Sequence, residues 1–439
     1  MSVELALFMF VPLMLLIFLG TPVAFALMSV ALAFGLWRFG PAVIHVFGAK
    51  VQDLTTSHVL AAAPLFIFMG AMLERSGISE RLFHAIALWT RPLPGGLAVG
   101  AIIMCVLFAA SSGVVGATET VVGMLAIPAM LRNGYDHGLI SGTICAGGAL
   151  GSMIPPSVLV VILALVAEVG IGDLFAGMLL PGLLLAALYI AYVLVRCTLD
   201  PTLAPVAADA PVVSLGERLR VTAIALLPPL VLIALVLGSI LGGVAVPTEA
   251  ASAGAVGALA LTVLNRRFSL RVLVDACVKT LSITAMILTI VLGGLMFSGV
   301  FAAVGGLRAL TELVQGAGLG PFGTLAIALA VTFVAGFVMD VISIILIVVP
   351  VALPLMLGFG FDPTWFCILL IIVLQTSLLT PPMAGAVFYL RTVAPPEITL
   401  RSMYRGVMPF VALHFVVLGL VLVFPELALW LPELLLDFD

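Results

Sequence analysis

The sequence predicts an all-α polytopic membrane protein with about ten membrane-spanning helices and two re-entrant helical hairpins, arranged as two inverted-topology repeats. Three observations support this fold class: the composition, apolar stretches of spanning length along the whole chain, and a similarity between its two halves. Of the 439 residues, 64% are hydrophobic and only 9% are charged, whereas soluble domains carry about 25% charged residues. This composition excludes a soluble enzyme.

The charged residues exclude two further classes of protein. The formal net charge is -4 and no run of Lys or Arg could neutralise a phosphate backbone, so no nucleic acid partner is expected. A protein bound to the membrane surface would need a soluble body and one basic amphipathic helix, whereas apolar stretches recur here from end to end. The cysteines and histidines are scattered without metal-ligand spacing, so neither a disulfide framework nor a metal centre built from them is expected.

Apolar stretches long enough to cross a bilayer, which takes about 20 residues in a helix, define the predicted spans. Residues 5–37 carry no charge but are interrupted by Gly20-Thr21-Pro22, which predicts two tightly joined short spans. Membrane lipid is expected around every span. The other spans are predicted near residues 60–74, 139–167, 174–196, 220–241, 247–265, 280–300, 364–392 and 406–425.

Two other apolar stretches, residues 95–131 and 322–357, predict re-entrant hairpins because small or polar residues divide each one. The first is divided at Ala110-Ser111-Ser112-Gly113, and the second at Ala335-Gly336 followed by Met339-Asp340. Each leg of about 16 to 18 residues is short for a full crossing, and non-helical backbone at membrane depth needs protein or a wet cavity around it. The alternative is two ordinary short spans in each stretch.

The basic residues predict the sidedness, because Lys and Arg concentrate in cytoplasmic loops. With the N-terminus outside, only Arg38, Lys50 and Arg308 of the 17 basic residues fall on the outer side. An even number of crossings then places the C-terminus outside as well.

The two halves of the chain align without a gap over residues 128–156 and 354–382. Five full crossings separate equivalent positions in the predicted topology, so the repeat is inverted, which is the architecture of secondary transporters. The shared residues are mostly ones that shape the backbone: Pro128/Pro354, Gly134/Gly360, Asp136/Asp362 and Pro155-Pro156/Pro381-Pro382.

This alignment predicts four parts of the chain. Residues 1–197 form the N-terminal repeat and residues 220–425 the C-terminal repeat, each with scaffold spans, a hairpin and a broken helix. A cytoplasmic linker, residues 198–219, joins them, and an external acidic tail, residues 426–439, follows.

Each Pro-Pro doublet should unwind about one helical turn, because proline lacks an amide donor and disfavours helix for the residue before it. At the first doublet, the freed carbonyls of Gly151, Ile154 and Pro156 would need a partner inside the membrane. A Na⁺ ion, which takes oxygen ligands, would satisfy them, with Ser111 and Ser112 supplying further oxygens from the hairpin.

The equivalent second Na⁺ site would use Gly336 of the second hairpin with Ser377, Thr380 and Met383 around the second doublet. The alternative for each break is a proline kink whose freed groups bond to water or to a neighbouring Ser or Thr. Helix N-termini at the hairpins and breaks carry positive partial charge and could hold an organic anion without a buried Arg.

Three acids lie within apolar sequence, Glu119, Glu249 and Asp340, and acids inside the membrane are candidates for functional sites. For Glu249 the alternative is a first-turn position favoured by the helix dipole, and for Glu119 a place facing a wet crevice. Asp340 is the strongest candidate, in the outer shell of the cation site or as a hinge lock. Glu119, Asp340 and Ser157 are the predicted substrate-binding or gating residues.

A set of short motifs occurs in order along the chain: Gly20-Thr21-Pro22-Val23-Ala24-Phe25, Pro64-Leu65-Phe66-Ile67-Phe68-Met69-Gly70, residues 108–123, Gly134-Tyr135-Asp136, Gly142-Thr143 with Ile154-Pro155-Pro156-Ser157, Pro247-Thr248-Glu249-Ala250-Ala251, Met339-Asp340 and Thr380-Pro381-Pro382. In their order and spacing these motifs resemble, over nearly the whole chain, the large membrane subunit of tripartite ATP-independent periplasmic (TRAP) transporters, the DctM type. The first hairpin, with Ser111-Ser112-Gly113-Val114-Val115-Gly116, looks like the branch associated with 2-oxo acids, lactate, or mannitol and chloroaromatic compounds.

The resemblance implies a permease in the bacterial inner membrane, with periplasmic termini, that has no enzymatic activity and needs no organic cofactor. It implies an elevator mechanism, in which the hairpins and broken helices carry an organic anion and the coupling ion Na⁺ across a scaffold of the other spans. It also implies two partners, a small four-helix membrane subunit (DctQ-like) and a periplasmic substrate-binding receptor (DctP-like).

Two alternatives to a receptor-dependent importer remain open at this point. One is a stand-alone Na⁺- or H⁺-coupled symporter or antiporter of organic anions, with Glu119 or Asp340 as the proton carrier. The other is a structural or ion-conducting subunit of a larger membrane complex.

Overall fold

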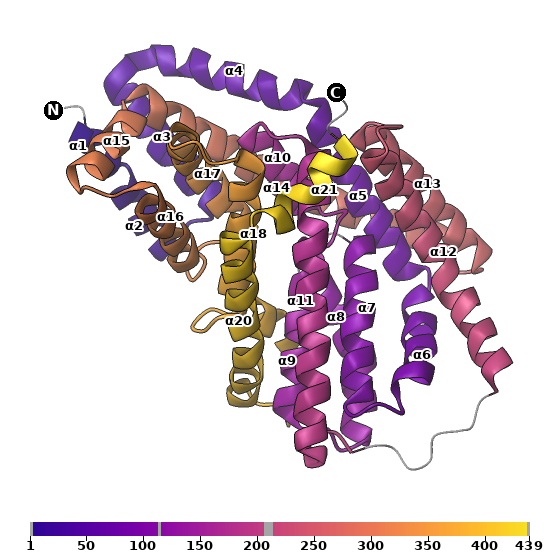
Figure 1. Ribbon diagram of the computed structural model, residues 1–439. Coiled ribbons are helices and arrows are strands. Elements are labelled where there is room, and N and C mark those ends of the chain that lie inside the picture. The colour runs from indigo at the N-terminus through magenta and orange to yellow at the C-terminus, as the bar shows by residue number, and fades with distance from the viewer. Residues whose placement is uncertain (1–2, 113–115, 206–213, 437–439) are drawn as a thin grey trace.

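Helices make up nearly all of the chain in the computed structural model, which describes residues 3–112, 116–205 and 214–436 (Figure 1). No β-strand occurs within these ranges. Within them, 7 helical segments are long and apolar enough to cross a membrane, and one further helix pair passes the same test around a bend of 67°. The predicted all-α membrane fold is therefore confirmed, whereas the count of about ten crossings stays a prediction.

The first apolar stretch is interrupted where the sequence predicts. Gly20 has a φ of +85°, and Pro22 directly precedes the next helix. The helices on the two sides are α1 (Val3–Phe8) and α2 (Phe10–Phe18), then α3 (Val23–Phe39), which leads through the 3-10 turn η1 (Gly40–Ala42) into α4 (Val43–Thr56). The sequence does not predict α4, which lies across one end of the molecule (Figure 1).

The predicted span near residues 60–74 is α5 (His58–Arg75). It is followed, after a bend of 67°, by α6 (Ile78–Thr90), which the sequence does not predict. Gly77 makes this bend with a φ of +73°, a conformation that glycine adopts at little cost.

Each predicted hairpin contains two consecutive helices, and in the second hairpin the residues between them, 336–340, are not helical. We call residues 110–116 the first tip and residues 335–340 the second tip; residues 113–115 lie outside the described part of the chain. The helices are α7 (Gly96–Ser112) and α8 (Ala117–Arg132) in the first hairpin, and α16 (Pro321–Ala335) and α17 (Val341–Gly358) in the second.

Both Pro-Pro doublets interrupt helices, as the sequence predicts. We call residues 150–157 the first break and residues 380–384 the second break. The peptide bonds Pro155-Pro156 and Pro381-Pro382 are both cis. The helices around the first break are α9 (His137–Ala149), η2 (Leu150–Ser152) and α10 (Val158–Ala167), and those around the second are α18 (Pro363–Leu379) and α19 (Gly385–Arg391).

The residues shared by the two halves have the same local role in each. Gly134 and Gly360 have φ values of +70° and +81° in the turns before α9 and α18. Asp136 caps the N-terminus of α9 and Asp362 caps that of α18, each accepting a hydrogen bond from the backbone amide three residues later, at 2.9 and 2.8 Å. The internal similarity is therefore one of helix starts as well as breaks.

The two broken helices run in opposite directions along α20 (Leu400–Val423). α9 begins beside the start of α20, where the backbones of Gly138 and Gly406 are in direct contact. α18 begins beside the end of α20, where Trp365 Nε1 donates a hydrogen bond of 2.9 Å to the Val421 carbonyl. Opposite directions at equivalent positions are what an inverted repeat requires.

Long helices outside the hairpins and breaks pack together as a second group. α13 (Pro247–Leu264) and α14 (Leu270–Ala303) pack along α5, and α14 also packs along α3. An ion pair of 2.5 Å between Lys279 and Glu74 joins α14 to α5. We call α3, α5, α13 and α14 the scaffold. The remaining helices are α11 (Ile171–Leu199), α12 (Leu215–Leu241), α15 (Gly306–Gly316) and α21 (Glu426–Leu436), with the 3-10 turn η3 (Pro201–Leu203) after α11.

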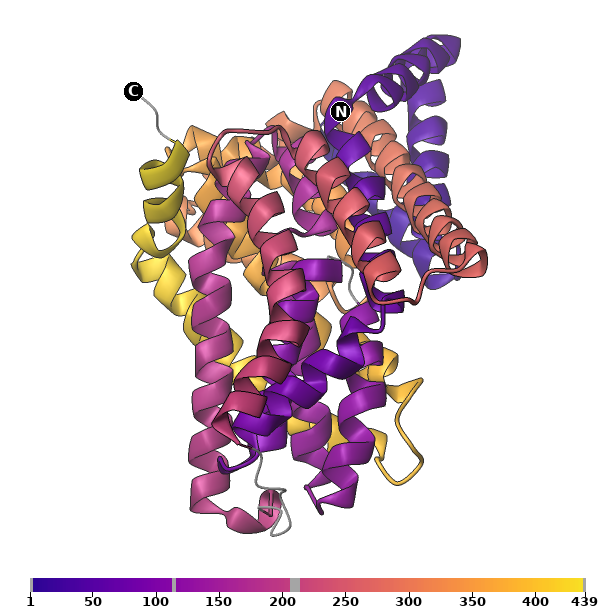
Figure 2. The ribbon, with the colours of Figure 1, turned by 90° about the vertical axis from the view of Figure 1, so that its right-hand side faces the viewer.

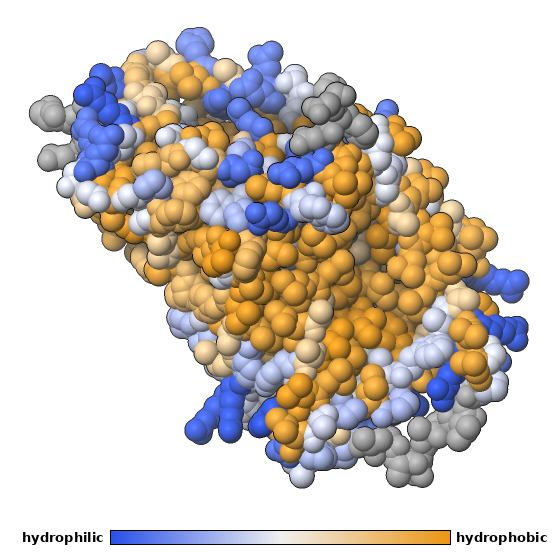
Figure 3. All heavy atoms as spheres, viewed as in Figure 1, coloured by the Kyte–Doolittle hydropathy of each residue, from blue (hydrophilic) through white to orange (hydrophobic). Residues whose placement is uncertain are grey.

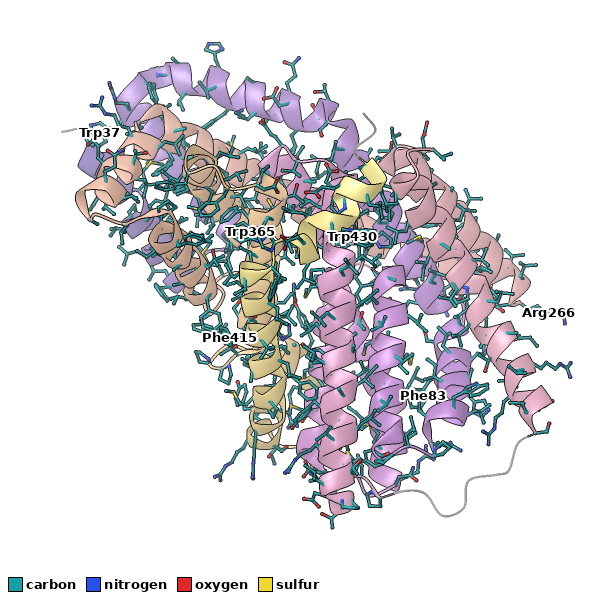
Figure 4. The ribbon with its side chains drawn as sticks, in the orientation of Figure 1. Trp37, Phe83, Arg266, Trp365, Phe415 and Trp430 are labelled. Atoms are coloured by element: carbon teal, nitrogen blue, oxygen red, sulfur yellow. The ribbon has the colours of Figure 1, made fainter. Side chains whose placement is uncertain are left out.

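The surface separates into an apolar middle and two polar ends, as a membrane protein requires (Figure 3). The first and last helices, α1 and α21, lie at the same end of the molecule (Figures 1 and 2). Trp37 and Trp430 are near that end (Figure 4), with exposed fractions of 69% and 52%. Tryptophan favours the membrane–water interface, so this end of the molecule has the character of a bilayer boundary.

Candidate functional site

The helices that flank the first tip, α7 and α8, pack against the first break. A methyl group placed on Gly151 would lie 3.5 Å from the Thr118 hydroxyl oxygen and 3.7 Å from Ala109 Cβ. The side chain of Glu119 lies directly over Gly148, where any Cβ would overlap it. The first hairpin thus packs against the first break, and the Na⁺ site that the sequence predicts between them stays a prediction.

Glu119 is fully buried at the start of α8, so it does not face an open crevice. Its Oε2 atom accepts a hydrogen bond of 3.0 Å from the backbone amide of Gly116. Its Oε1 atom has no hydrogen-bond partner among the described residues. A buried oxygen without a partner is costly, and a carboxylate oxygen more so, which makes this atom a candidate cation ligand.

The first break leaves polar groups without partners, as its proline doublet predicts. The carbonyls of Gly151, Ile154 and Pro156 accept no hydrogen bond from the described part of the chain. Ser157 is fully buried, and its hydroxyl oxygen also lacks a partner there. Of these groups, Gly151 is the one whose contact with the first hairpin is direct, beside Thr118 and Ala109.

Ser111 and Ser112, the predicted ligands from the first hairpin, are the last two residues of α7. Their backbone is helical, but their side chains lie outside the described part of the structure.

The second tip packs against the last turn of α18, directly before the second break. Gly336 of the tip packs directly against the Ser377 hydroxyl, with no room for a Cβ between them. Thr380 lies one turn further on, where its carbonyl accepts a hydrogen bond of 3.1 Å from the Ala384 amide. The hydroxyls of Ser377 and Thr380 are both bonded to carbonyls of α18, at 2.7 and 2.6 Å, so their lone pairs remain available to a cation.

A cavity of about 490 Å³ opens beside the second tip. Its walls come from the second hairpin, the second break, the first turns of α10 and the scaffold helix α14. A site for a small organic ligand is usually lined by many apolar groups and a few polar ones. The polar lining is supplied by Asp340, Ser377 and Tyr389 with the backbone at Gly336 and Met383, and the apolar lining includes Val158, Ile162, Ile283, Met286, Ile287 and Ile290.

Asp340 is exposed to this cavity and caps α17. Its carboxylate accepts hydrogen bonds from the Ser343 amide at 3.0 Å and from the Ser343 hydroxyl at 2.5 Å. The carboxylate therefore starts the inner helix of the second hairpin and at the same time places a negative charge at the cavity wall.

Glu249 lies away from both tips. It lines a separate, more open hollow of about 650 Å³ between the turn that joins α10 to α11 and the turn that joins α12 to α13. Its carboxylate accepts a hydrogen bond of 3.2 Å from the Val246 amide at the start of α13. This is the first-turn position that the sequence offers as its alternative role.

Two residues near the sites are absent from the sequence prediction. Tyr389 of α19 lines the 490 Å³ cavity and also touches Gly116 of the first tip. Gln375 of α18 is fully buried, and neither its amide nitrogen nor its amide oxygen has a partner in the described ranges. An amide side chain within the apolar run of α18 is a signal that could have identified Gln375, whereas nothing local singles out Tyr389.

The sequence is similar to those of known proteins. Residues 10–427 match the family described as tripartite ATP-independent periplasmic transporter, DctM component. The chain is 32% identical to the C4-dicarboxylate TRAP transporter large permease protein DctM of Pseudomonas aeruginosa, over 90% of this chain and 91% of that protein. It is 30% identical to the sialic acid TRAP transporter large permease protein SiaM of Vibrio cholerae, over 96% and 97%.

A solved structure shares the fold. The YdaH transporter of Alcanivorax borkumensis superimposes with a TM-score of 0.60 at 16% identity, covering 94% of this chain and 98% of that one. The relatives are transporter permeases, not enzymes, which agrees with the composition and the helix pattern. The chain belongs to the DctM family, the large permease components of TRAP transporters.

Proposed function

We propose that this protein is the transmembrane subunit of a Na⁺-coupled, receptor-dependent importer of a small organic acid in the bacterial inner membrane. The observation that supports it best is that each hairpin packs against the broken helix of its own repeat, α7 and α8 at Gly151 and the second tip at Ser377. Two half-built oxygen sites related by inverted symmetry are the arrangement by which secondary transporters hold ions at mid-membrane.

The first Na⁺ site is formed by the carbonyls of Gly151, Ile154 and Pro156. The free Oε1 atom of Glu119 and the hydroxyls of Ser111 and Ser112 are its further ligands. A cation here would satisfy oxygens that have no partner among the described residues and would neutralise a buried carboxylate.

The second Na⁺ site is formed by Gly336, Ser377, Thr380 and Met383, next to the 490 Å³ cavity. The cavity is the substrate site. Because Asp340 places a negative charge at its wall, an organic anion would bind there only together with a cation, and this requirement couples substrate to Na⁺.

The substrate is a small carboxylate, and the first hairpin favours one of the 2-oxo acid or lactate type. Two of the relatives are named for C4-dicarboxylates and for sialic acid, which are also carboxylates. The cavity volume of about 490 Å³ accommodates a molecule of this size.

The scaffold side of the cavity suits an elevator movement. Ile283, Met286, Ile287 and Ile290 of α14 present an apolar wall to the cavity. A wall without charged groups offers no fixed partner to the substrate, so the hairpins and broken helices can carry it past α14. A DctQ-like small subunit and a DctP-like receptor complete the assembly, with both termini of this chain in the periplasm.

The proposal is tested by reconstituting this protein with its small subunit and receptor in proteoliposomes. Uptake of radiolabelled lactate, pyruvate and succinate would be measured under an inward Na⁺ gradient and under an inward H⁺ gradient. We expect uptake of at least one of these acids to require both Na⁺ and the receptor. Receptor-independent uptake driven by H⁺ would instead support the stand-alone symporter, in which the buried Glu119 would carry the proton.

A further inference from the structure

Tyr389 follows the second break in the sequence. It contacts Gly116 of the first tip and lines the cavity beside the second tip. A Cβ placed on Gly116 of the first tip would lie 2.9 Å from two carbons of the Tyr389 ring. The same side chain lines the 490 Å³ cavity together with Gly336 and Asp340 of the second tip. Its exposed fraction is 44%, so the side chain is accessible to a ligand.

One hydrogen bond links Gly116, which Tyr389 contacts, to Glu119 of the first candidate cation site. The Gly116 amide donates to Oε2 of Glu119 at 3.0 Å, and Gly116 has a φ of +87°. A displacement of the Glu119 carboxylate therefore moves the backbone on which the Tyr389 ring rests. The positive φ and the absent Cβ both restrict this position to glycine.

Residues that follow Tyr389 also pack on the first hairpin. Leu390 and Val393 pack on Gly123 of α8, where a Cβ would lie 2.8 and 3.1 Å from their methyl groups. The half-helix after the second break is thus packed on the hairpin of the other repeat. The first hairpin and the Tyr389 side chain should move as one unit.

From this geometry we propose that Tyr389 couples the first cation site to the substrate cavity. A cation that binds Oε1 of Glu119 shifts the carboxylate and, through the Gly116 amide, sets the position of the Tyr389 ring in the cavity. The proposal rests on the function proposed above. Because binding free energies are linked reciprocally, occupation of the cavity must in turn strengthen cation binding at Glu119.

The two parts of the side chain have separate tasks. The ring transmits the movement by contact with Gly116, so phenylalanine should preserve coupling. The hydroxyl belongs to a side chain that lines the cavity and is 44% exposed, so it can donate to a carboxylate bound there. Loss of the hydroxyl alone should weaken substrate affinity and leave the response to Na⁺ intact.

The test uses a reporter in the cavity and Na⁺ alone as the probe. Cys277 is the exposed native cysteine and the other four are buried, so Cys277→Ser provides a quiet background. Met286→Cys then places a thiol on the scaffold wall of the cavity, where the native side chain is 53% exposed. The rate of its modification by N-ethylmaleimide is measured in the full-length protein, in Na⁺ and in equal K⁺.

We expect Na⁺ to change the modification rate about fivefold or more, the low end of a typical coupling between two sites. The change should persist in Tyr389→Phe and disappear in Tyr389→Ala. Phe388→Ala is the matched control, since Phe388 is the adjacent aromatic residue, is 46% exposed and does not line the cavity. It should respond to Na⁺ like the background.

A parallel measurement separates failure of this inference from failure of the proposed function. Na⁺ relative to K⁺ should raise the melting temperature of the background protein and of Tyr389→Ala, which also shows that the variant is folded. If Na⁺ raises both melting temperatures but Tyr389→Ala keeps the Na⁺ effect on the reporter, Tyr389 is not the coupling residue. If Na⁺ raises neither, the cation sites themselves are wrong.

Discussion

At the scale of single residues, the two acids of the hairpins have opposite surroundings. Glu119 is fully buried with one carboxylate oxygen unpartnered within the described ranges, whereas Asp340 is exposed and accepts two hydrogen bonds from Ser343. Glu119 therefore needs a partner for its free carboxylate oxygen, whereas Asp340 already has a structural role as a helix cap. Their roles should be separable by substitutions that keep shape and change charge.

Glu119→Gln should weaken Na⁺ binding about tenfold, equivalent to about 1.4 kcal/mol, because it removes the charge and keeps the shape. The measurement is the Na⁺ dependence of the melting temperature of the purified protein. Glu249→Gln is the control, since glutamine also serves in the capping arrangement at the start of α13. An unchanged Na⁺ response in Glu119→Gln would exclude Glu119 as a ligand.

Asp340→Asn should retain the melting temperature, because asparagine caps helices about as well as aspartate, and Asp340→Ala should lose about 0.5 to 2 kcal/mol of stability. We expect Asp340→Asn nevertheless to transport poorly, since the charge at the cavity wall is lost. Asp362→Asn, at the cap of α18, controls for the change of residue type. Wild-type uptake by Asp340→Asn would show that Asp340 is a cap alone.

At the scale of elements, close backbone contacts set how the two repeats interlock. α9 crosses α20 where Gly138 and Gly142 meet Gly406, and α18 crosses α11 where Ile368 packs on Gly177. These crossings are equivalent under the inverted symmetry. Small residues at helix crossings allow the close approach that replaces the hydrophobic effect inside a membrane.

Gly406→Ala should push α9 and α20 apart and lower the stability by about 1 to 3 kcal/mol, since its Cβ would overlap the backbone of Gly138. Gly419→Ala on the same helix is the matched control, because nothing lies within 4 Å of its Cβ position. There we expect no loss, or a gain of up to about 1 kcal/mol from helix propensity. Equal melting temperatures for the two variants would contradict this account of the crossing.

At the scale of the whole molecule, the orientation in the membrane is a prediction from the distribution of basic residues. The structure is consistent with it in one respect, because α1 and α21 lie at the same end (Figure 2). Cys277 lies between Arg271 and Lys279, in the segment predicted to be cytoplasmic. It is exposed, so it reports sidedness without any substitution.

A membrane-impermeant maleimide should label Cys277 in inside-out vesicles and leave it unlabelled in right-side-out vesicles. Glu433→Cys in α21, made in the Cys277→Ser background, should show the reverse pattern and so controls for vesicle integrity. Labelling of Cys277 from the outside would invert the predicted topology.

The sequence by itself determined the features that have local causes. Proline and glycine act on their own backbone, so the tips, the Pro-Pro breaks and the interruption at Gly20 could be located without coordinates. The same holds for the helix starts at Asp136 and Asp362, whose caps reach three residues along the chain. The apolar composition made the membrane class certain, because so little charge is incompatible with a soluble fold.

The tertiary structure alone decided what distant segments do to one another. It separated a buried Glu119 from an exposed Asp340, although both lie in similar apolar sequence. It also placed Tyr389 on Gly116, because the half-helix α19 packs on the hairpin of the other repeat. Burial and contacts between segments far apart in sequence arise from packing of the whole chain, and no local backbone preference encodes them.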